Sequence, residues 1–345
     1  MTENRDYGLI IGIAHYPHLR RLEGPIEDAR QFANWLKQEG NLPEGNVKLI
    51  ESVPDESGLP VLAEVESALD DIIRQAEVHP GAGRRLYVYF AGHGCAEELE
   101  HVALLMANAR EGHFQRAALD ATQYRRAMAI RAFPEQLYLF DCCRFSDPAV
   151  RGLGPNWDPD RDSKKLPGLV QVVMYAAGFK ERAWERRLHY DERRGLFTVA
   201  LMEGLLGAAS REGVIKSDRL ASYVQQRVED LARQEKLEED QNCDFSAYGS
   251  SRPLILAKNV TAWERRVTVA LPRGTRKLRV TDESDIRVKA ETVPPGDTDI
   301  ILTLPLGWYT ISAESDSSAA SSKTIQLLPG KSDSPYAVDL REGAA

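Results

Sequence analysis

The sequence predicts an α/β domain, in which helices cover both faces of a mostly parallel six-stranded sheet, followed by a small all-β sandwich. Three observations predict it. Up to about residue 257, short apolar runs alternate with stretches of helical periodicity, the pattern of a parallel sheet covered by helices. Several of these runs end abruptly on polar or reactive residues. From residue 258 onward the helical pattern stops, and alternating β-branched runs lie between Gly, Pro and Asp turns.

We therefore expect two domains, at 1–257 and 258–345. Continuous apolar runs predict the strands of the first domain, six or so of which form its sheet: 8–13, 47–50, 86–91, 102–106, 136–140, 169–177 and 253–256. Apolar residues at helical spacing predict the helices: 26–36, 59–77, 121–130, 197–206 and 220–233. Alternating runs predict the strands of the second domain: 266–271, 277–281, 286–290, 299–304, 308–313 and 324–328.

Composition narrows the class of protein. The chain has 345 residues, a 43% apolar share and a net charge of −8, which fits a globular protein and argues against a general binder of nucleic acid. Its four cysteines do not have the spacing of a disulfide framework, so a reducing compartment is expected. No apolar run is long enough to span a membrane, and the N-terminus lacks a signal-peptide pattern. We expect a cytoplasmic protein.

Two of the predicted strands stop on reactive side chains. Residues 87–94 end in Gly-His-Gly, and residues 137–144 end in Asp-Cys-Cys-Arg. Since reactive groups of parallel sheets gather at the carboxyl ends of strands, His93 and Cys143 are expected to meet there. Together they are the minimal parts of a thiol nucleophile with its base. His93 has an alternative interpretation as a core histidine with satisfied hydrogen bonds.

Five motifs in order carry a resemblance to a known family. They are 9–13 with Tyr16 and Leu19, 22–29, 89–94, 141–144 and 195–201. Over about 250 residues the chain resembles caspase-fold cysteine peptidases, closest in pattern to prokaryotic caspase homologues and metacaspases. The resemblance implies a hydrolase that acts on protein or peptide substrates and uses no cofactor.

The resemblance also assigns the roles of the catalytic residues. The family pattern Asp-x-Cys makes Cys143 the nucleophile and His93 its base, with Cys142 as a buried spacer. Strand alternation agrees, because Asp141 and Cys143 fall on one side of the chain and Cys142 on the other. The resemblance implies that the backbone N–H groups of Gly94 and Cys143 form the oxyanion hole. A zinc site made of His93, Cys95, Cys142 and Cys143 is disfavoured by the spacing of these residues, and no metal is expected.

Substrate specificity is predicted from charge. Animal caspases hold an acidic residue with arginines, but Leu22 stands at one of those positions here. The resemblance to Arg- and Lys-specific metacaspases instead places Asp28 and Asp141 at the bottom of the specificity pocket, where two carboxylates attract a guanidinium. The alternative interpretation of Asp28 is an exposed residue in the first turn of a helix. Ala91 departs from the family, which often has serine there.

Three further expectations complete the sequence analysis. Trp184 is expected either to line the substrate groove or to pack on the surface. The Gly-, Pro- and Asp-rich segment 145–167 is expected to be an exposed loop, cut to activate a zymogen by the enzyme itself or by an upstream protease. The alternative function is a catalytically inactive, caspase-like scaffold that acts through its C-terminal β domain. The oligomeric state is left open.

Overall fold

The computed structural model describes residues 5–54, 57–78, 83–96, 101–131, 133–146, 152–155, 165–187, 193–235, 237, 241–282, 287–315, 321–327 and 336–341. The chain divides into two compact units. The first comprises 1–202 and 224–256, and the second comprises 203–223 and 257–345. Each unit is described by itself below.

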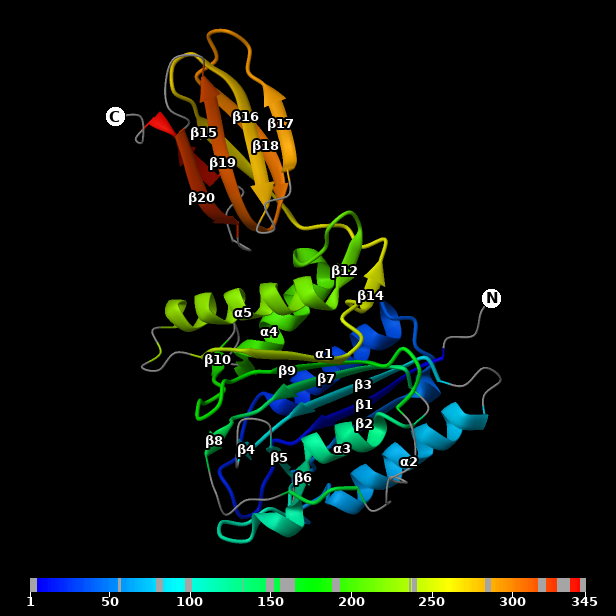
Figure 1. The fold of residues 1–345 in the computed structure, drawn as a ribbon. Helices are drawn as coiled ribbons and strands as arrows, with labels where there is room; N and C mark the ends of the chain where they lie inside the picture. Colours follow the sequence, from blue (N-terminus) through cyan, green and yellow to red (C-terminus); the bar gives the residue numbers. More distant parts are fainter. Residues whose placement is uncertain are drawn as a thin grey trace. The chain divides into compact units, whose positions relative to one another are not determined.

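A six-stranded sheet forms the centre of the first unit (Figure 1). Its strand order is β13-β9-β7-β3-β1-β2. The strands are β1 (Asp6–Gly12), β2 (Val47–Glu51), β3 (Arg85–Ala91), β7 (Glu135–Asp141), β9 (Val170–Tyr175) and β13 (Asp244–Gly249). All neighbours pair in parallel except β13, which runs antiparallel to β9 at the edge. The mostly parallel six-stranded sheet predicted from the sequence is therefore confirmed.

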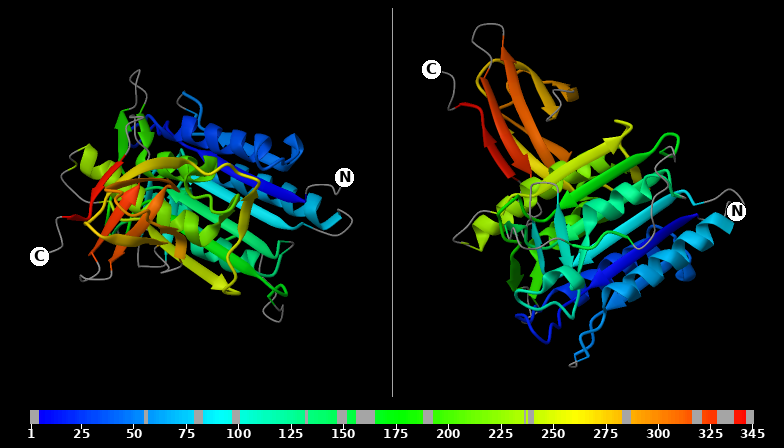
Figure 2. Two further views of the ribbon diagram at one scale, coloured as in Figure 1. Left: turned by 90° about the horizontal axis from the view of Figure 1, so that it is seen from above. Right: turned by 60° about the horizontal axis from the view of Figure 1, so that its bottom comes forward.

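Helices cover both faces of this sheet, as Figures 1 and 2 show. They are α1 (Pro25–Gln38), α2 (Leu62–Val78), α3 (Ala121–Met128), α4 (Leu196–Glu203) and α5 (Ser217–Gln234). Side chains of α2 and α3 share one hydrophobic cluster with strand residues such as Phe90 and Phe140. On the opposite face, Phe32 of α1 stacks on Tyr89 of β3, and Thr198 of α4 hydrogen-bonds the Tyr89 hydroxyl. Alternation along the strands thus supplies both faces with core residues.

The structure corrects two predicted strands. The run predicted at 102–106 lies outside the central sheet, in a small sheet of order β6-β5-β4-β8. Its strands are β4 (Gly94–Ala96), β5 (Val102–Leu105), β6 (Ala118–Asp120) and β8 (Phe145–Ser146). The sixth central strand is β13, and not the run at 253–256, which overlaps β14 (Ile255–Lys258). The sequence did not reveal β13 because an edge strand with half-exposed side chains carries no continuous apolar run.

Short elements complete the first unit and begin the second. These are the 3₁₀ turns Glu44–Asn46 and Phe114–Ala117, the strands β10 (Glu185–Arg187), β11 (Arg193–Gly195) and β12 (Val214–Lys216), and the π-helical turn Gly204–Ala208. β10 and β11 form an antiparallel ribbon. Glu185 of β10 and Arg193 and Gly195 of β11 line the cavity of the first unit.

The second unit contains two β-sheets of order β18-β15-β21 and β17-β16-β19-β20. Its strands are β15 (Glu264–Ala270), β16 (Thr275–Asp282), β17 (Arg287–Thr292), β18 (Asp299–Pro305), β19 (Gly307–Ser315), β20 (Ser321–Leu327) and β21 (Tyr336–Asp339). Segment 203–223 belongs to this unit, and its Arg211 lies 5.2 Å from the ring centre of Tyr309 and donates to the Tyr309 hydroxyl.

Candidate active site

The carboxyl ends of β3 and β7 place His93 and Cys143 on one cavity of about 540 Å³. β3 and β7 are adjacent and parallel, with Ala91 opposite Asp141, so the residues just beyond each strand emerge at the same edge. The cavity is also lined by Asp28 at the start of α1 and by Glu185 of β10. Side chains far apart in the sequence therefore converge at one place.

The two adjacent cysteines occupy different environments. Cys142 is 2% exposed and belongs to the hydrophobic cluster, as strand alternation predicts for the spacer. Cys143 is half-buried and lines the cavity. Its Sγ accepts a hydrogen bond from the Ala183 N–H at 3.4 Å and donates weakly to the Ala183 carbonyl at 3.8 Å. Burial raises the pKa of the Cys143 thiol, so the resting form is the neutral thiol.

His93 is held by the loop that follows β1. Its Nε2 lies 2.6 Å from the carbonyl oxygen of Arg20. A carbonyl oxygen only accepts hydrogen bonds, so Nε2 carries the proton in the neutral ring and Nδ1 is left as the basic nitrogen. The hydroxyl of Tyr16 accepts from the His93 backbone N–H at 2.9 Å and donates to the Leu105 carbonyl, and the two rings are 4.7 Å apart. Burial lowers the pKa of His93, which keeps the imidazole neutral.

The histidine and the thiol are not hydrogen-bonded to each other. Within the described part of the chain, His93 contacts Arg20 and Tyr16, while the Cys143 sulfur contacts Ala183. Apo enzymes often tighten such contacts only when substrate binds. The geometry is that of a neutral thiol beside a neutral base, each held by backbone groups of a different loop.

The two predicted pocket carboxylates both line the cavity. Asp28 is 2% exposed, so its alternative interpretation as an exposed helix residue is wrong. It accepts hydrogen bonds from the Arg194 guanidinium and, at 3.0 Å, from the Gly195 N–H. Asp141 accepts from the Thr198 hydroxyl at 2.6 Å and from its N–H at 3.2 Å, both at Oδ2. Burial raises the pKa of both aspartates, and the charge of Arg194 opposes this shift at both.

Glu23 and Glu185 are two further carboxylates on the cavity, and neither was predicted from the sequence. Glu185 is the more enclosed of the two. It lines the cavity and accepts a hydrogen bond from the Gly24 N–H at 2.9 Å. Its negative charge contributes to raising the pKa of Asp141, so the two carboxylates are electrostatically linked. Gly195 lets its backbone lie against the Asp141 carboxylate, because a Cβ at that position would collide with the carboxylate oxygens. In the sequence, only one feature could have identified Glu185, which is its position directly after Trp184. Trp184 also lines the cavity.

Gly94 lies beside Cys142 and Cys143 and is not among the residues that line the cavity. It starts β4, and a Cβ added to it would lie 2.6 Å from the Cys142 sulfur and 2.9 Å from the Cys143 carbonyl oxygen. Only glycine permits this close approach of the two backbones. Ala91, where the family often carries serine, lines the cavity without a polar side-chain group.

Among the described residues, no group of three or more His, Cys, Asp or Glu side chains is arranged to hold a metal ion. No helix in the described part of the chain is both long and apolar enough to cross a membrane.

Comparisons with known proteins agree with this fold. The chain is similar to the crystal structure of caspase-1 from Spodoptera frugiperda, at 15% identity and a TM-score of 0.50, covering 74% of this chain and 92% of that chain. The structure of pro-sf-caspase-1 matches at 16% identity and a TM-score of 0.41, over the same shares of the two chains. No curated protein matches. The model of the caspase domain matches residues 5–255. The chain therefore belongs to the caspase-domain family of cysteine peptidases.

Proposed function

We propose that the protein is a cysteine endopeptidase that cleaves polypeptides after arginine or lysine through a Cys143–His93 dyad. The observation that carries the proposal is one cavity lined by a half-buried thiol, an imidazole and four carboxylates: Glu23, Asp28, Asp141 and Glu185. The thiol and imidazole supply a nucleophile and a base. The carboxylates favour a cationic side chain and repel an acidic one.

The proposed mechanism starts from the neutral pair. Since Nε2 of His93 donates to the Arg20 carbonyl, Nδ1 takes the Cys143 proton as the sulfur attacks the peptide carbonyl. The contact between Cys143 and Ala183 is exchanged for contacts with the substrate. Backbone N–H groups of Gly94 and Cys143 stabilise the oxyanion, and one such donor is worth about 3–4 kcal/mol. The imidazolium then protonates the leaving amine, and water hydrolyses the thioester.

In the proposed pocket, Asp141 and Glu185 bind the guanidinium directly, and Asp28 supports it. Asp28 already shares a buried ion pair with Arg194, so its charge is partly neutralised within the protein. By contrast, Oδ1 of Asp141 has no hydrogen bond among the described residues, while Oδ2 is held by Thr198. Thr198 therefore orients the Asp141 carboxylate, and Oδ1 is the oxygen that can bind a ligand.

The alternative function is a catalytically inactive binding protein. One observation favours it, which is that the Cys143 sulfur is occupied by the Ala183 backbone and has a raised pKa. The same contact also fits a latent form of an active enzyme. We propose the latter, in which cleavage within segment 145–167, by the enzyme itself or by an upstream protease, releases the loops at the cavity. Arg151, Arg161 and Lys164 of that segment lie outside the described residues, whereas Lys165 is exposed.

A labelling experiment tests the proposed function. An arginine chloromethyl ketone peptide should add covalently to the wild-type protein, and mapping of the digested protein should locate the adduct on Cys143. The corresponding aspartate reagent should label much less. Labelling of Cys142 instead, or equal labelling by both reagents, would contradict the assignment.

A further inference from the structure

The rim of the cavity carries more positive than negative charge, because four arginines lie there beside one exposed carboxylate, that of Glu23. Arg20, Arg21 and Arg182 line the cavity and are exposed. Their guanidinium groups have no carboxylate partner among the described residues. Arg193, a fourth lining arginine, differs because it lies 3.6 Å from the Glu23 carboxylate. Among the described residues, the cavity thus combines buried negative charge with three positive charges at its entrance that have no carboxylate partner.

These rim arginines come from two different loops. Arg20 and Arg21 belong to the loop that holds His93 through the Arg20 carbonyl. Arg182 precedes Ala183, whose backbone contacts the Cys143 sulfur. A peptide bond placed between Cys143 and His93 therefore has rim arginines on both the thiol side and the histidine side.

A substrate with a lone basic residue uses only the acidic part of this charge distribution. Its cationic side chain is attracted by the carboxylates, but it must approach past three positive charges at the entrance. Acidic residues next to the basic one are attracted by the rim arginines. The electrostatic contribution of the rim to substrate binding then becomes favourable. An exposed guanidinium–carboxylate pair changes a binding constant by about 1.5- to 5-fold, so several together alter selectivity measurably.

We propose that the cavity selects peptide segments in which the basic residue is flanked by acidic residues. The inference rests on the proposed function and goes beyond it, since it names the charge pattern of the substrate. Flanking carboxylates pair with Arg182 on one side of the bond and with Arg20 and Arg21 on the other. The contribution of the rim is electrostatic and exposed, so it weakens as salt is added.

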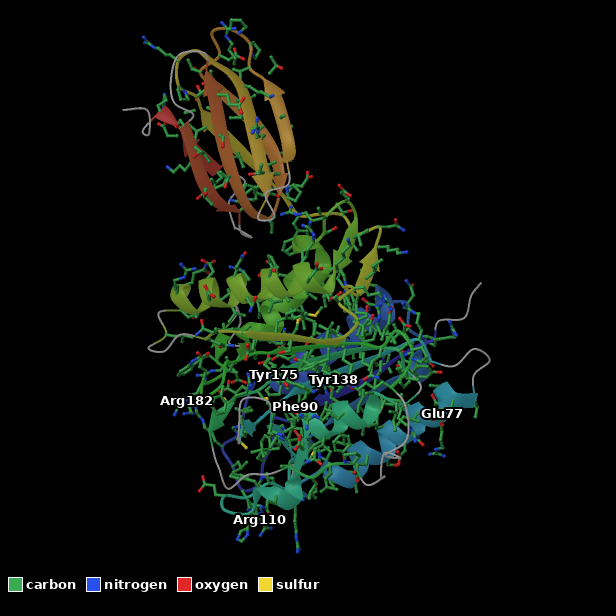
Figure 3. The ribbon with its side chains drawn as sticks, in the orientation of Figure 1. Glu77, Phe90, Arg110, Tyr138, Tyr175 and Arg182 are labelled. Carbon is green, nitrogen blue, oxygen red and sulfur yellow. The ribbon has the colours of Figure 1, made fainter. Side chains whose placement is uncertain are left out.

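Two quenched fluorescent peptides with a single arginine test the inference, one with glutamate and one with glutamine on both sides of it. At low salt, wild-type kcat/KM should be about 5- to 20-fold higher for the glutamate peptide, and the ratio should shrink toward one at about 500 mM salt. The variant Arg21→Gln/Arg182→Gln should lower the low-salt ratio to near one. Arg110→Gln is the matched control and should keep the wild-type ratio, because Arg110 is exposed and does not line the cavity; Figure 3 shows it apart from Arg182.

The outcomes separate this inference from the proposed function. Equal cleavage of the two peptides, or a ratio that the double variant leaves unchanged, would overturn the charge pattern while the peptidase activity stands. Failure to cleave either arginine peptide, with cleavage of an aspartate peptide, would overturn the proposed specificity and this inference together. Thermal unfolding of each variant checks that the substitutions leave the fold intact.

Discussion

The Nε2 atom of His93 lies 2.6 Å from the backbone carbonyl oxygen of Arg20, 73 residues away in the chain. This hydrogen bond fixes which ring nitrogen carries the proton. Tyr16, from the same loop, contacts the backbone N–H and the ring of His93. One loop thus sets the tautomer and the position of the proposed base.

Removing the Tyr16 hydroxyl should impair turnover more than substrate binding. Tyr16→Phe leaves the ring in place but deprives the His93 N–H and the Leu105 carbonyl of a partner. We expect kcat to fall about 10-fold with little change in KM, since each net hydrogen bond is worth about 1 kcal/mol. Steady-state kinetics with an arginine peptide measure this. Tyr138→Phe, which removes another buried hydroxyl, is the control and should leave kcat unchanged.

The pH dependence of kcat/KM follows from the pKa of His93 in the free enzyme. Burial lowers this pKa, and the proposed base works only when neutral, so activity is lost as the pH falls through the lowered value. The acid limb of the kcat/KM profile should therefore lie below pH 6.5, the usual value of a free imidazole. Burial raises the pKa of Asp28 to about 7, so an acid limb above pH 6.5 contradicts this prediction when it persists in Asp28→Asn.

The adjacent cysteines should respond differently to substitution. Cys143→Ala should reduce kcat/KM by roughly three to six orders of magnitude, because it removes the proposed nucleophile. Cys142→Ala should keep most of the activity and mainly lower stability, by about 1–2 kcal/mol, since its side chain lies in the hydrophobic cluster. Peptide turnover and urea unfolding, measured on both variants, check the pair. An inactive, folded Cys142→Ala beside an active Cys143→Ala would shift the nucleophile by one residue.

Much of the site could be predicted because its residues end recognisable apolar runs or belong to motifs. His93 and Cys143 follow β3 and β7, and the parallel pairing of those strands brings them to one cavity. Tyr16, Glu185 and Arg194 could not be predicted in their observed roles. Their contacts join loops that only the folded chain brings together, such as Arg194 with Asp28 across 166 residues.

Some strands of the fold could be predicted from the sequence and others could not. The buried central strands are continuous apolar runs and are recognisable, whereas β13 is a half-exposed edge strand without such a run. The strand at 102–106 has an apolar run as strong as the others, yet it joins the small sheet. Apolar periodicity indicates that a strand is buried, and it does not specify which sheet the strand joins.

The two buried aspartates should separate stability from specificity. Asp28→Ala leaves the Arg194 guanidinium buried without its carboxylate, so we expect a loss of about 3–5 kcal/mol in the free energy of unfolding. The double variant Asp28→Ala/Arg194→Met should recover much of it. Asp141→Asn retains the shape of the side chain and should instead lower kcat/KM for arginine peptides about 10- to 100-fold. Urea unfolding and peptide kinetics distinguish the two; a stable Asp28→Ala would show that the ion pair contributes little.

Processing within segment 145–167 should increase activity. Freshly purified Cys143→Ala should be intact by mass spectrometry, while wild-type protein accumulates cleavage after a basic residue of that segment. The cleaved wild type should turn over peptides at least several-fold faster than the uncut form. Equal rates for the cut and uncut forms would exclude activation by processing.

The central claim is a thiol peptidase whose acidic pocket selects a basic residue. Its most direct test is kcat/KM for three peptides that differ only in having arginine, glutamine or aspartate before the cleaved bond, with Cys143→Ala as the blank. The account predicts arginine to exceed glutamine by at least about 100-fold, no measurable cleavage after aspartate, and no activity in Cys143→Ala. Cleavage after aspartate, or turnover that survives in Cys143→Ala, would contradict it.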